Sequence, residues 1–202
     1  GSVLVLGASP VLAQVVPSGE LETGLKEWRS VQGEGWRVVV REESGWAELV
    51  YGASIEPSFR PVTDADFVVL AREYVGLTVG LHGVEPASLV GARAVWLRLV
   101  GTTDKFTVRF LQVLGGVAVV DGRVNVLMDT EGRLLSVHST SLAGLDGLST
   151  LPGFDGDSAR RRAARAFSVE TQLIATSVGA AELVIAQVGE GGDLQARLAW
   201  KV

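Results

Sequence analysis

The chain has 202 residues, of which 47% are hydrophobic and 20% are charged, so it can bury a stable core without crosslinks as one large domain or two small ones. Its 18 Lys and Arg residues are outnumbered by 23 Asp and Glu residues, and the net charge of −5 gives no basic footprint for binding nucleic acid. The absence of cysteine excludes disulfides, thiolate zinc sites and cysteine nucleophiles.

The first segment, residues 3–13, is apolar and uncharged but too short to span a bilayer. Val11 and Ala13 lie three and one residues before Gln14, which is the small-residue pattern of a secretory cleavage site. We interpret residues 1–13 as a signal-peptide remnant, which predicts a secreted or extracytoplasmic protein without membrane association in its mature form. The alternative is a cloning remnant, Gly1-Ser2, followed by a buried strand.

Residues 14–35 mix Gly, Ser, Glu and Lys without clear periodicity, and we predict a linker there, with a short helix around Leu25 and Trp28. Residues 36–41 and 46–51 then alternate apolar and polar side chains on either side of a Gly-containing turn, which is typical of a β-hairpin.

The segment Thr63-Asp64-Ala65-Asp66 predicts the start of a helix, because a hydroxyl cap is followed by a carboxylate at the third helical position. Apolar residues follow at helical spacing from Phe67 onward, and Gly76 and Gly80 predict that the helix ends near Val75.

After Gly91 the apolar period changes from helical to two. We predict strands at residues 95–99, 106–112, 123–129 and 134–140, with tight turns at Gly115-Gly116 and Glu131-Gly132. One helix crossing four antiparallel strands predicts an α+β domain over residues 36–143. Its expected core residues are Phe67, Leu70, Tyr74, Val95, Leu97, Phe106, Val108, Phe110, Val124 and Val126.

Residues 144–156 are rich in Gly, Leu, Ser and Asp, and we predict a second linker there. A helix beginning near Asp157-Ser158, with Ala159, Ala163 and Phe167 on one stripe, precedes strands at 182–188 and 194–202. Residues 157–202 are therefore expected to form a second domain. The predicted fold class is α+β, with two cystatin-like units that each pack a helix on an antiparallel sheet.

The sequence shows no catalytic site, and we expect neither enzymatic activity nor a metal ion or cofactor. His82 and His138 are too few for a catalytic zinc site with three protein ligands, and we interpret both as surface or edge residues. No Gly-x-Ser-x-Gly turn marks a nucleophile. The glycine pairs 115–116 and 191–192 lack the strand-to-helix context of a phosphate loop.

The densest positive cluster is the run Arg160-Arg161-Arg162 with Arg165. Such a run is usually a solvated helix face, and the alternative is a handle for an acidic partner surface that mainly raises the association rate. The candidate partner contacts are Arg160, Arg161, Arg162 and Trp200.

The run from Phe106 to Val126 resembles a block of the fungalysin/thermolysin propeptide (FTP) domain. In that block an Arg-Phe strand ends in paired Gln residues, a Gly-Val-Pro-Val turn and a later Gly follow, and Asp-x-x-Gly closes the next strand. Leu111 stands where the first Gln is usual and Ala118 replaces the Pro, which indicates a divergent member. The matching residues are Arg109, Phe110, Gln112, Gly116, Val117, Val119, Gly122, Asp129 and Gly132.

The C-terminal helix and residues 198–202 resemble the PepSY domain that commonly follows FTP, so the resemblance spans roughly residues 35–202. It implies the pro-region of a secreted zinc metallopeptidase zymogen, which acts as intramolecular chaperone and inhibitor of a catalytic domain in the same chain. A free-standing exported binding module or an inhibitor acting in trans is the alternative, and an unrecognised hydrolase or small-ligand protein is a third. Arg109 and Gln112 either brace the sheet or meet the partner, and buried polar partners would indicate bracing.

Overall fold

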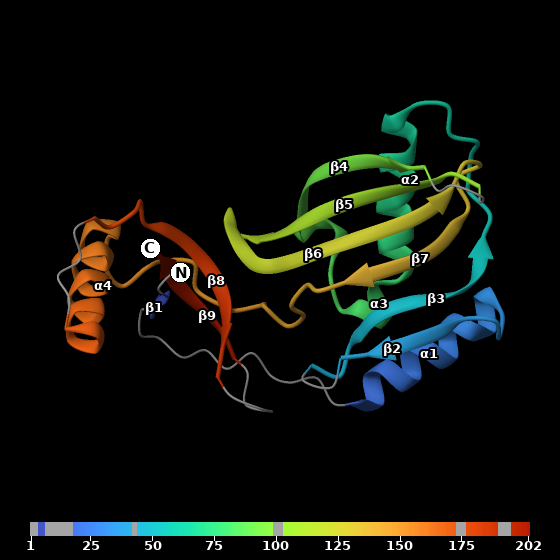
Figure 1. Cartoon of the computed structure of the whole chain (residues 1–202). Coiled ribbons are helices and arrows are strands. Elements are labelled where there is room, and N and C mark those ends of the chain that lie inside the picture. Colours follow the sequence, from blue (N-terminus) through green and yellow to red (C-terminus); the bar gives the residue numbers. More distant parts are fainter. Residues whose placement is uncertain (1–3, 7–17, 42–43, 99–102, 173–176, 190–194) are drawn as a thin grey trace. The chain divides into compact units, whose positions relative to one another are not determined.

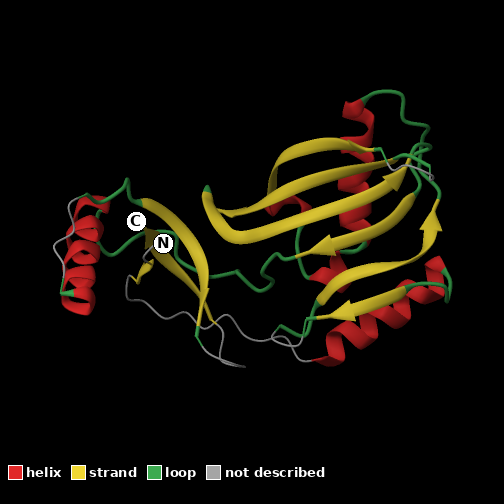
Figure 2. Ribbon diagram, in the orientation of Figure 1, coloured by secondary structure: helices red, strands yellow, loops and turns green. Residues whose placement is uncertain are grey.

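The computed structural model describes residues 4–6, 18–41, 44–98, 103–172, 177–189 and 195–202. Contacts divide the chain into unit 1, residues 1–13, 114–120 and 145–202, and unit 2, residues 14–113 and 121–144. Both units combine helical structure with β-strands, one described helix in unit 1 and several in unit 2 (Figure 2), so the predicted α+β fold class is confirmed. The elements are β1 Leu4–Leu6, α1 Ser18–Gln32, β2 Arg37–Val40, β3 Ala47–Ile55, α2 Asp64–Leu77, α3 Val79–His82, η1 Pro86–Ser88, β4 Leu89–Leu97, β5 Lys105–Leu114, β6 Val117–Asp129, β7 Leu134–Ser139, α4 Gly156–Thr171, β8 Glu182–Val188 and β9 Gln195–Lys201.

Unit 2 is built on a sheet in which the strands follow the order β4-β5-β6-β7-β3-β2. The registers of β4 with β5, of β6 with β7, of β7 with β3 and of β3 with β2 are all antiparallel. The predicted hairpin and the predicted four-strand meander are therefore both present. They join into one sheet because β3 pairs with β7, a long-range pairing that leaves no mark in the local pattern.

The predicted start of α2 is confirmed in detail. Thr63 caps the helix by accepting a hydrogen bond from the Asp66 backbone, and the Asp66 carboxylate accepts in return from the Thr63 backbone. These backbone hydrogen bonds hold the pKa of Asp66 below its ordinary value. The helix ends at Leu77, slightly beyond the predicted end, and α3 follows after a single residue.

The helix predicted around Leu25 and Trp28 is present, but the linker predicted over residues 14–35 is wrong, because α1 occupies most of this segment and buries Leu21 and Trp28 in the core of unit 2. Trp28 meets Trp36 edge to face, with ring centroids 5.5 Å apart. The helix also lies close to α3, since a Cβ on Gly24 would be 2.5 Å from the carbonyl oxygen of Gly80. Tertiary packing thus stabilises a helix whose Gly and Ser residues give it a weak propensity.

Most of the predicted core of unit 2 is buried, but Val95 and Leu97 are each 37% exposed. Both belong to β4, which lies at the edge of the sheet. Val95 is opposite Thr107 and Leu97 is opposite Lys105, and these side chains lie on the sheet face turned away from α2. Alternation predicted correctly that they share a face, but it could not show which face is covered. Buried as predicted are Phe67, Leu70, Tyr74, Phe106, Val108, Phe110, Val124 and Val126.

Unit 1 contains an antiparallel pair, β8 and β9, to which β1 adds beside β9 and the first part of β6 adds beside β8. The pairing of β6 with β8 is parallel, which explains why residues 114–120 group with unit 1 although they were expected in the first domain. Asp155 caps α4, and Ala159 and Ala163 are buried as predicted, whereas Phe167 is exposed.

The N-terminal segment forms a short strand at Leu4–Leu6 that pairs with β9. This strand corresponds to the second of the two interpretations of residues 1–13. The cleavage pattern before Gln14 lies outside the described residues, so secretion remains a prediction.

Candidate interaction surface

The sheet of unit 2 has one face covered by helices, and we call the opposite side the outer face. Helix α2 contacts β4 and β7, and α3 contacts β3, on the side where Phe106, Val108 and Phe110 are buried. Figure 1 shows α2 and α3 behind the sheet, with the outer face toward the viewer. The helices described for unit 2 therefore leave the outer face open.

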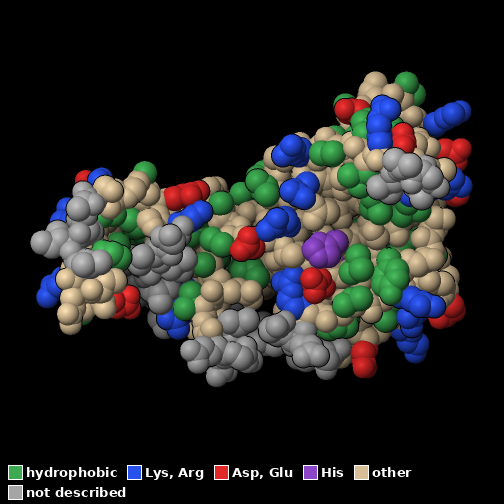
Figure 3. Space-filling view, viewed as in Figure 1, with side chains coloured by type: hydrophobic (Ala, Val, Ile, Leu, Met, Phe, Trp, Pro, Cys, Tyr) green, Lys and Arg blue, Asp and Glu red, His purple; other side chains and the backbone are tan. Residues whose placement is uncertain are grey.

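A row of polar side chains crosses this face from β4 to β7, and we call it the polar row: Arg93, Arg109, Asn125 and His138. Arg93 is directly opposite Arg109 in the register of β4 and β5. Arg109 Nε donates to Asn125 Oδ1 at 2.8 Å, and Asn125 is opposite His138. His138 Nε2 lies 3.4 Å from Glu48 Oε1. Figure 3 shows Lys and Arg side chains over β4, β5 and β6, and apolar side chains toward β3 and β2.

The pairing of Arg93 with Arg109 is electrostatically unfavourable, because like charges directly opposite in a sheet repel each other. Among the ion pairs of the described residues, none joins a carboxylate to either guanidinium. Asn125 holds Arg109 through Nε, which leaves its other N–H groups for another acceptor. Two adjacent guanidinium groups with free N–H donors can bind the carboxylates of a partner, because a guanidinium binds a carboxylate through two parallel hydrogen bonds.

Apolar side chains surround the polar row. Leu111 on β5 is 51% exposed, although the flanking Phe110 and Gln112 are buried. An exposed patch that combines large apolar residues with arginine is typical of the centre of a protein–protein interface. Further exposed apolar residues on this face, among those the structure describes, include Val39, Tyr51, Val90, Val95 and Leu97.

The structure gives Arg109 and Gln112 different roles. Gln112 is buried, its Nε2 donates to the Leu142 carbonyl at 2.6 Å, and its Oε1 accepts from the Leu142 backbone N–H at 2.8 Å. Gln112 therefore braces the segment after β7 against β5, as expected for a buried polar group with partners. Arg109 lies on the open face of the same strand and is available to a partner.

Phe110 between them is fully buried, and the Arg72 guanidinium lies over its ring at 4.9 Å from the centroid. Among the other matching positions, Gly116 forms the turn after β5 together with Gly115. Their φ angles of 82° and 55° belong to a conformation that glycine adopts without strain. Val119 and Gly122 are buried in β6, and Val117 is half-buried. These positions shape the chain rather than present groups to a partner.

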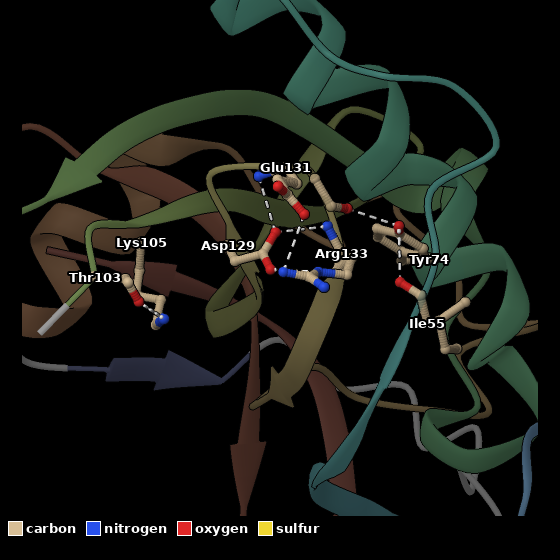
Figure 4. Close-up of polar contacts among 8 residues, drawn as sticks. Ile55, Tyr74, Thr103, Lys105, Asp129, Glu131 and Arg133 are labelled. Atoms are coloured by element: carbon tan, nitrogen blue, oxygen red, sulfur yellow. Dashed lines mark hydrogen bonds and ion pairs between the residues drawn. The ribbon is translucent and has the colours of Figure 1, made fainter.

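Asp129 and Gly132 organise the turn between β6 and β7 (Figure 4). Asp129 Oδ1 accepts from the Glu131 and Arg133 backbone N–H groups at 2.9 and 3.0 Å, and Oδ2 accepts from Arg133 Nε at 2.6 Å. Burial alone would raise the pKa of Asp129, but these hydrogen bonds and the Arg133 charge lower it overall. The Tyr74 hydroxyl donates to the Gly132 carbonyl at 2.7 Å, and burial raises the pKa of Tyr74 to about 12.

Replacing Asp129 with Asn is expected to destabilise unit 2 by about 1–2 kcal/mol, because the amide NH₂ then faces the Arg133 Nε donor that the carboxylate now satisfies. Urea unfolding followed by tryptophan fluorescence measures this loss. Glu131→Gln is the matched control, since the Glu131 side chain is exposed and is expected to change stability by less than about 0.5 kcal/mol. Equal midpoints for the two variants would contradict the role given to Asp129.

The basic cluster of α4 belongs to unit 1, and each of its first three arginines has a neighbour in its own unit. Arg160 pairs with Asp157 at 3.3 Å, and Arg161 donates to the Ser158 hydroxyl at 2.8 Å. Arg162 lies over the Phe154 ring at 4.2 Å from its centroid.

Trp200, the other candidate partner contact, is half-buried beside the start of α4. Its Nε1 donates to the Phe154 carbonyl at 3.1 Å, so the indole N–H is satisfied within unit 1. The Arg cluster is exposed on the helix, whereas Trp200 has a packing role.

His82 was expected to be a surface or edge residue, but it is buried, because α3 ends against β3. Its Nδ1 lies 2.7 Å from the Ala47 carbonyl, so Nδ1 carries the proton, and Nε2 has no partner among the described residues. Burial lowers the pKa of His82 to about 4, with smaller contributions from the His138 and Arg41 charges, against the opposing effect of the Ala47 hydrogen bond.

The described residues contain no group of three or more His, Asp or Glu side chains arranged to hold a metal ion. No described helix combines the length and the apolar character needed to cross a membrane.

Sequence reasoning singled out Arg109 but missed Arg93, Asn125 and Glu48. The alternation of side chains along β4 and β5 assigns Arg93 and Arg109 each to a face of its own strand, and this alternation is visible in the sequence. Their alignment depends on a register irregularity between Val90 and Arg93, which local sequence does not reveal.

Comparison with known proteins gives one weak likeness. No family model matches the chain, and no curated protein matches it. The solved structure of the Bacillus megaterium YpeB C-terminal domain is 12% identical, with 93% of this chain and 86% of that chain covered and a TM-score of 0.39. This likeness is too low to assign a family.

Proposed function

We propose that the chain is the non-catalytic pro-region of a secreted thermolysin/fungalysin-like metallopeptidase. In this role it assists the folding of the catalytic domain and inhibits it until processing. The FTP-like run that contains Arg109 and Gln112 suggests the family. The observation that carries the proposal is the open outer face, where two arginines without carboxylate partners among the described residues lie amid exposed apolar side chains.

The physical basis of such a role is a large interface with another folded domain. Secreted peptidases depend on kinetic stability, with a high barrier between folded and unfolded states. A domain that binds the folding transition state lowers this barrier, and its removal leaves the enzyme trapped in the native state. Inhibition requires only that the pro-region exclude substrate from the open metal position of the catalytic domain.

Because the pro-region and the catalytic domain would be covalently connected, weak binding between them is sufficient for inhibition. Two linked domains meet at an effective concentration on the order of millimolar, so modest affinity keeps the catalytic domain covered. Proteolysis removes this advantage and leaves only intrinsic affinity. The arginine pair adds electrostatic attraction to an acidic surface, which raises the association rate at low salt.

We expect the purified chain to inhibit thermolysin, used as a representative zinc peptidase, in a peptide hydrolysis assay. It is also expected to raise the yield of active enzyme when denatured thermolysin is refolded with it. Arg109→Glu is expected to weaken both effects about tenfold, because it places a carboxylate where we expect one from the partner. Arg60→Glu, at an exposed position outside the sheet, is the matched control and is expected to have no effect.

Failure of the wild-type chain in both assays would rule out action on thermolysin in trans, and equal losses in both variants would rule out the outer face as the contact. The reading frame provides an independent test of whether the chain acts on a catalytic domain in the same polypeptide. A downstream segment with a His-Glu-x-x-His helix is expected, and a frame that ends near Val202 would exclude that form. The chain would then be the free-standing binding module or trans-acting inhibitor, for which the same open face would serve.

A further inference from the structure

Strand β4 is at the edge of the unit 2 sheet, and β5 is its one partner among the described strands. Among the backbone hydrogen bonds of the described residues, none satisfies residues 90–97 on the side away from β5. Figure 1 shows β4 as the outermost strand of this sheet. A strand in this position offers a row of free N–H and C=O groups to another chain.

The side chains of β4 are exposed for the same reason. Trp96 on the inner side is 39% exposed although it packs edge to face on Phe67 and Phe106, and Phe106 is fully buried. Val95 and Leu97 are exposed on the other side. Apolar residues thus remain open on both faces of one strand, and a neighbouring strand beyond β4 would cover both.

Only half of β4 carries the features that usually protect an edge strand. The register is irregular between Val90 and Arg93, and Gly91 has a φ of 64°, so the first half is bent away from regular pairing. Residues 93–97 pair regularly and contain no proline and no charge directed inward. The opposite edge, β2, has four residues and is irregular between Val39 and Val40.

The charges near this edge favour an acidic occupant. Arg93 lies on the regular segment, Arg109 is its neighbour on β5, and no ion pair among the described residues joins a carboxylate to either. The nearby Asp64 accepts from Trp96 Nε1 at 3.3 Å on the inner side. A second copy of β4 would bring another Arg93 and no carboxylate, so charge complementarity favours a different partner.

We propose that residues 93–97 of β4 accept an extended, carboxylate-bearing peptide segment as an additional strand. Backbone hydrogen bonds provide the pairing, as in other cases of β-strand addition, and a carboxylate of the segment lies beside Arg93 and Arg109. This inference does not depend on the pro-region proposal, because it concerns the edge of the sheet and any acidic extended segment.

Fluorescence anisotropy of three dye-labelled synthetic peptides tests the proposal on the full chain. The first is acetyl-Glu-Val-Glu-Val-Glu-Val-Glu-amide, the second has Lys in place of Glu, and the third is the acidic peptide with N-methylated valines. Only the first is expected to bind, with an affinity that falls as salt is raised. Binding of the lysine peptide or the methylated peptide with equal affinity would overturn the proposal, as would no binding of the acidic peptide below about 1 mM.

Variants on the two sheet edges then locate the binding. Arg93→Glu and Val95→Lys on β4 are each expected to weaken binding of the acidic peptide about tenfold, by charge repulsion and by an edge-blocking lysine. Arg37→Glu and Val39→Lys are the matched changes on β2 and are expected to leave it unchanged. Equal losses from both edges would overturn the proposal. A dimer in sedimentation that Val95→Lys dissociates would also overturn it, because the occupant would be a second copy.

Discussion

Replacing Gln112 with Met is expected to destabilise unit 2 by about 3 kcal/mol, the largest loss that we expect from a polar residue of this chain. Met preserves the volume of the side chain but removes both the donor to the Leu142 carbonyl and the acceptor of the Leu142 N–H. Gln112 is only 3% exposed, so both backbone groups of Leu142 lose their partner in a buried place. Each such group costs about 1–3 kcal/mol.

Urea unfolding followed by tryptophan fluorescence is a suitable measurement, because four of the five tryptophans belong to unit 2. Leu111→Met is the matched control on the neighbouring residue, and its exposed side chain is expected to tolerate the change. If Gln112→Met costs less than about 1 kcal/mol, Gln112 does not brace the segment at Leu142, and a direct role toward a partner would return for this position.

Acidification from pH 6.5 to pH 4 is expected to lower the free energy of unfolding of unit 2 through His82. Burial lowers the pKa of this histidine from 6.5 to about 4 in the folded state. Between these values the unfolded chain binds a proton that the folded chain excludes, so stability rises with pH across this window. The contribution is fully present above about pH 6.5, is lost as the pH falls, and amounts to about 3 kcal/mol.

Free energies of unfolding measured at several pH values between 4 and 7 test this prediction. His82→Asn should show a much smaller dependence, because its amide can still donate toward the Ala47 carbonyl but does not titrate. His138→Asn, at the more exposed histidine, is expected to retain most of this dependence, because the His138 charge contributes little to the lowered pKa of His82. An equal dependence in wild type and His82→Asn would show that other groups cause the acid sensitivity. The aspartates with lowered pKa values contribute mainly below about pH 5, so the pH 5–7 part of the curve reports on His82.

The family motif identified only part of the candidate surface. The FTP-like run singled out Arg109 and Gln112 together, which are three positions apart on one strand and therefore point to opposite faces of the sheet. Alternation separates the two faces, but only the tertiary structure shows that the face of Gln112 is covered, where it bonds to the Leu142 backbone 30 residues away, and that the face of Arg109, which bonds to Asn125, is open. Arg93 was not identified, since its position opposite Arg109 depends on the register of β4.

The sequence by itself determined the elements whose cause is local. The capping residues Thr63 and Asp66 set the start of α2, the two glycines at 115–116 permit the turn after β5, and alternation set the strands of the meander. In each case the physical cause lies within a few residues along the chain, in a cap, a backbone conformation or a period of two.

Only the tertiary structure decided which faces are covered and which segments meet. Burial of Leu21 and Trp28 makes a helix of a segment with weak propensity, and the edge position of β4 exposes Val95, which alternation alone placed in the core. Burial of His82 likewise follows from the contact of α3 with β3. These outcomes depend on contacts between residues far apart in the chain, and the hydrophobic effect acts on the surface that such contacts remove from water.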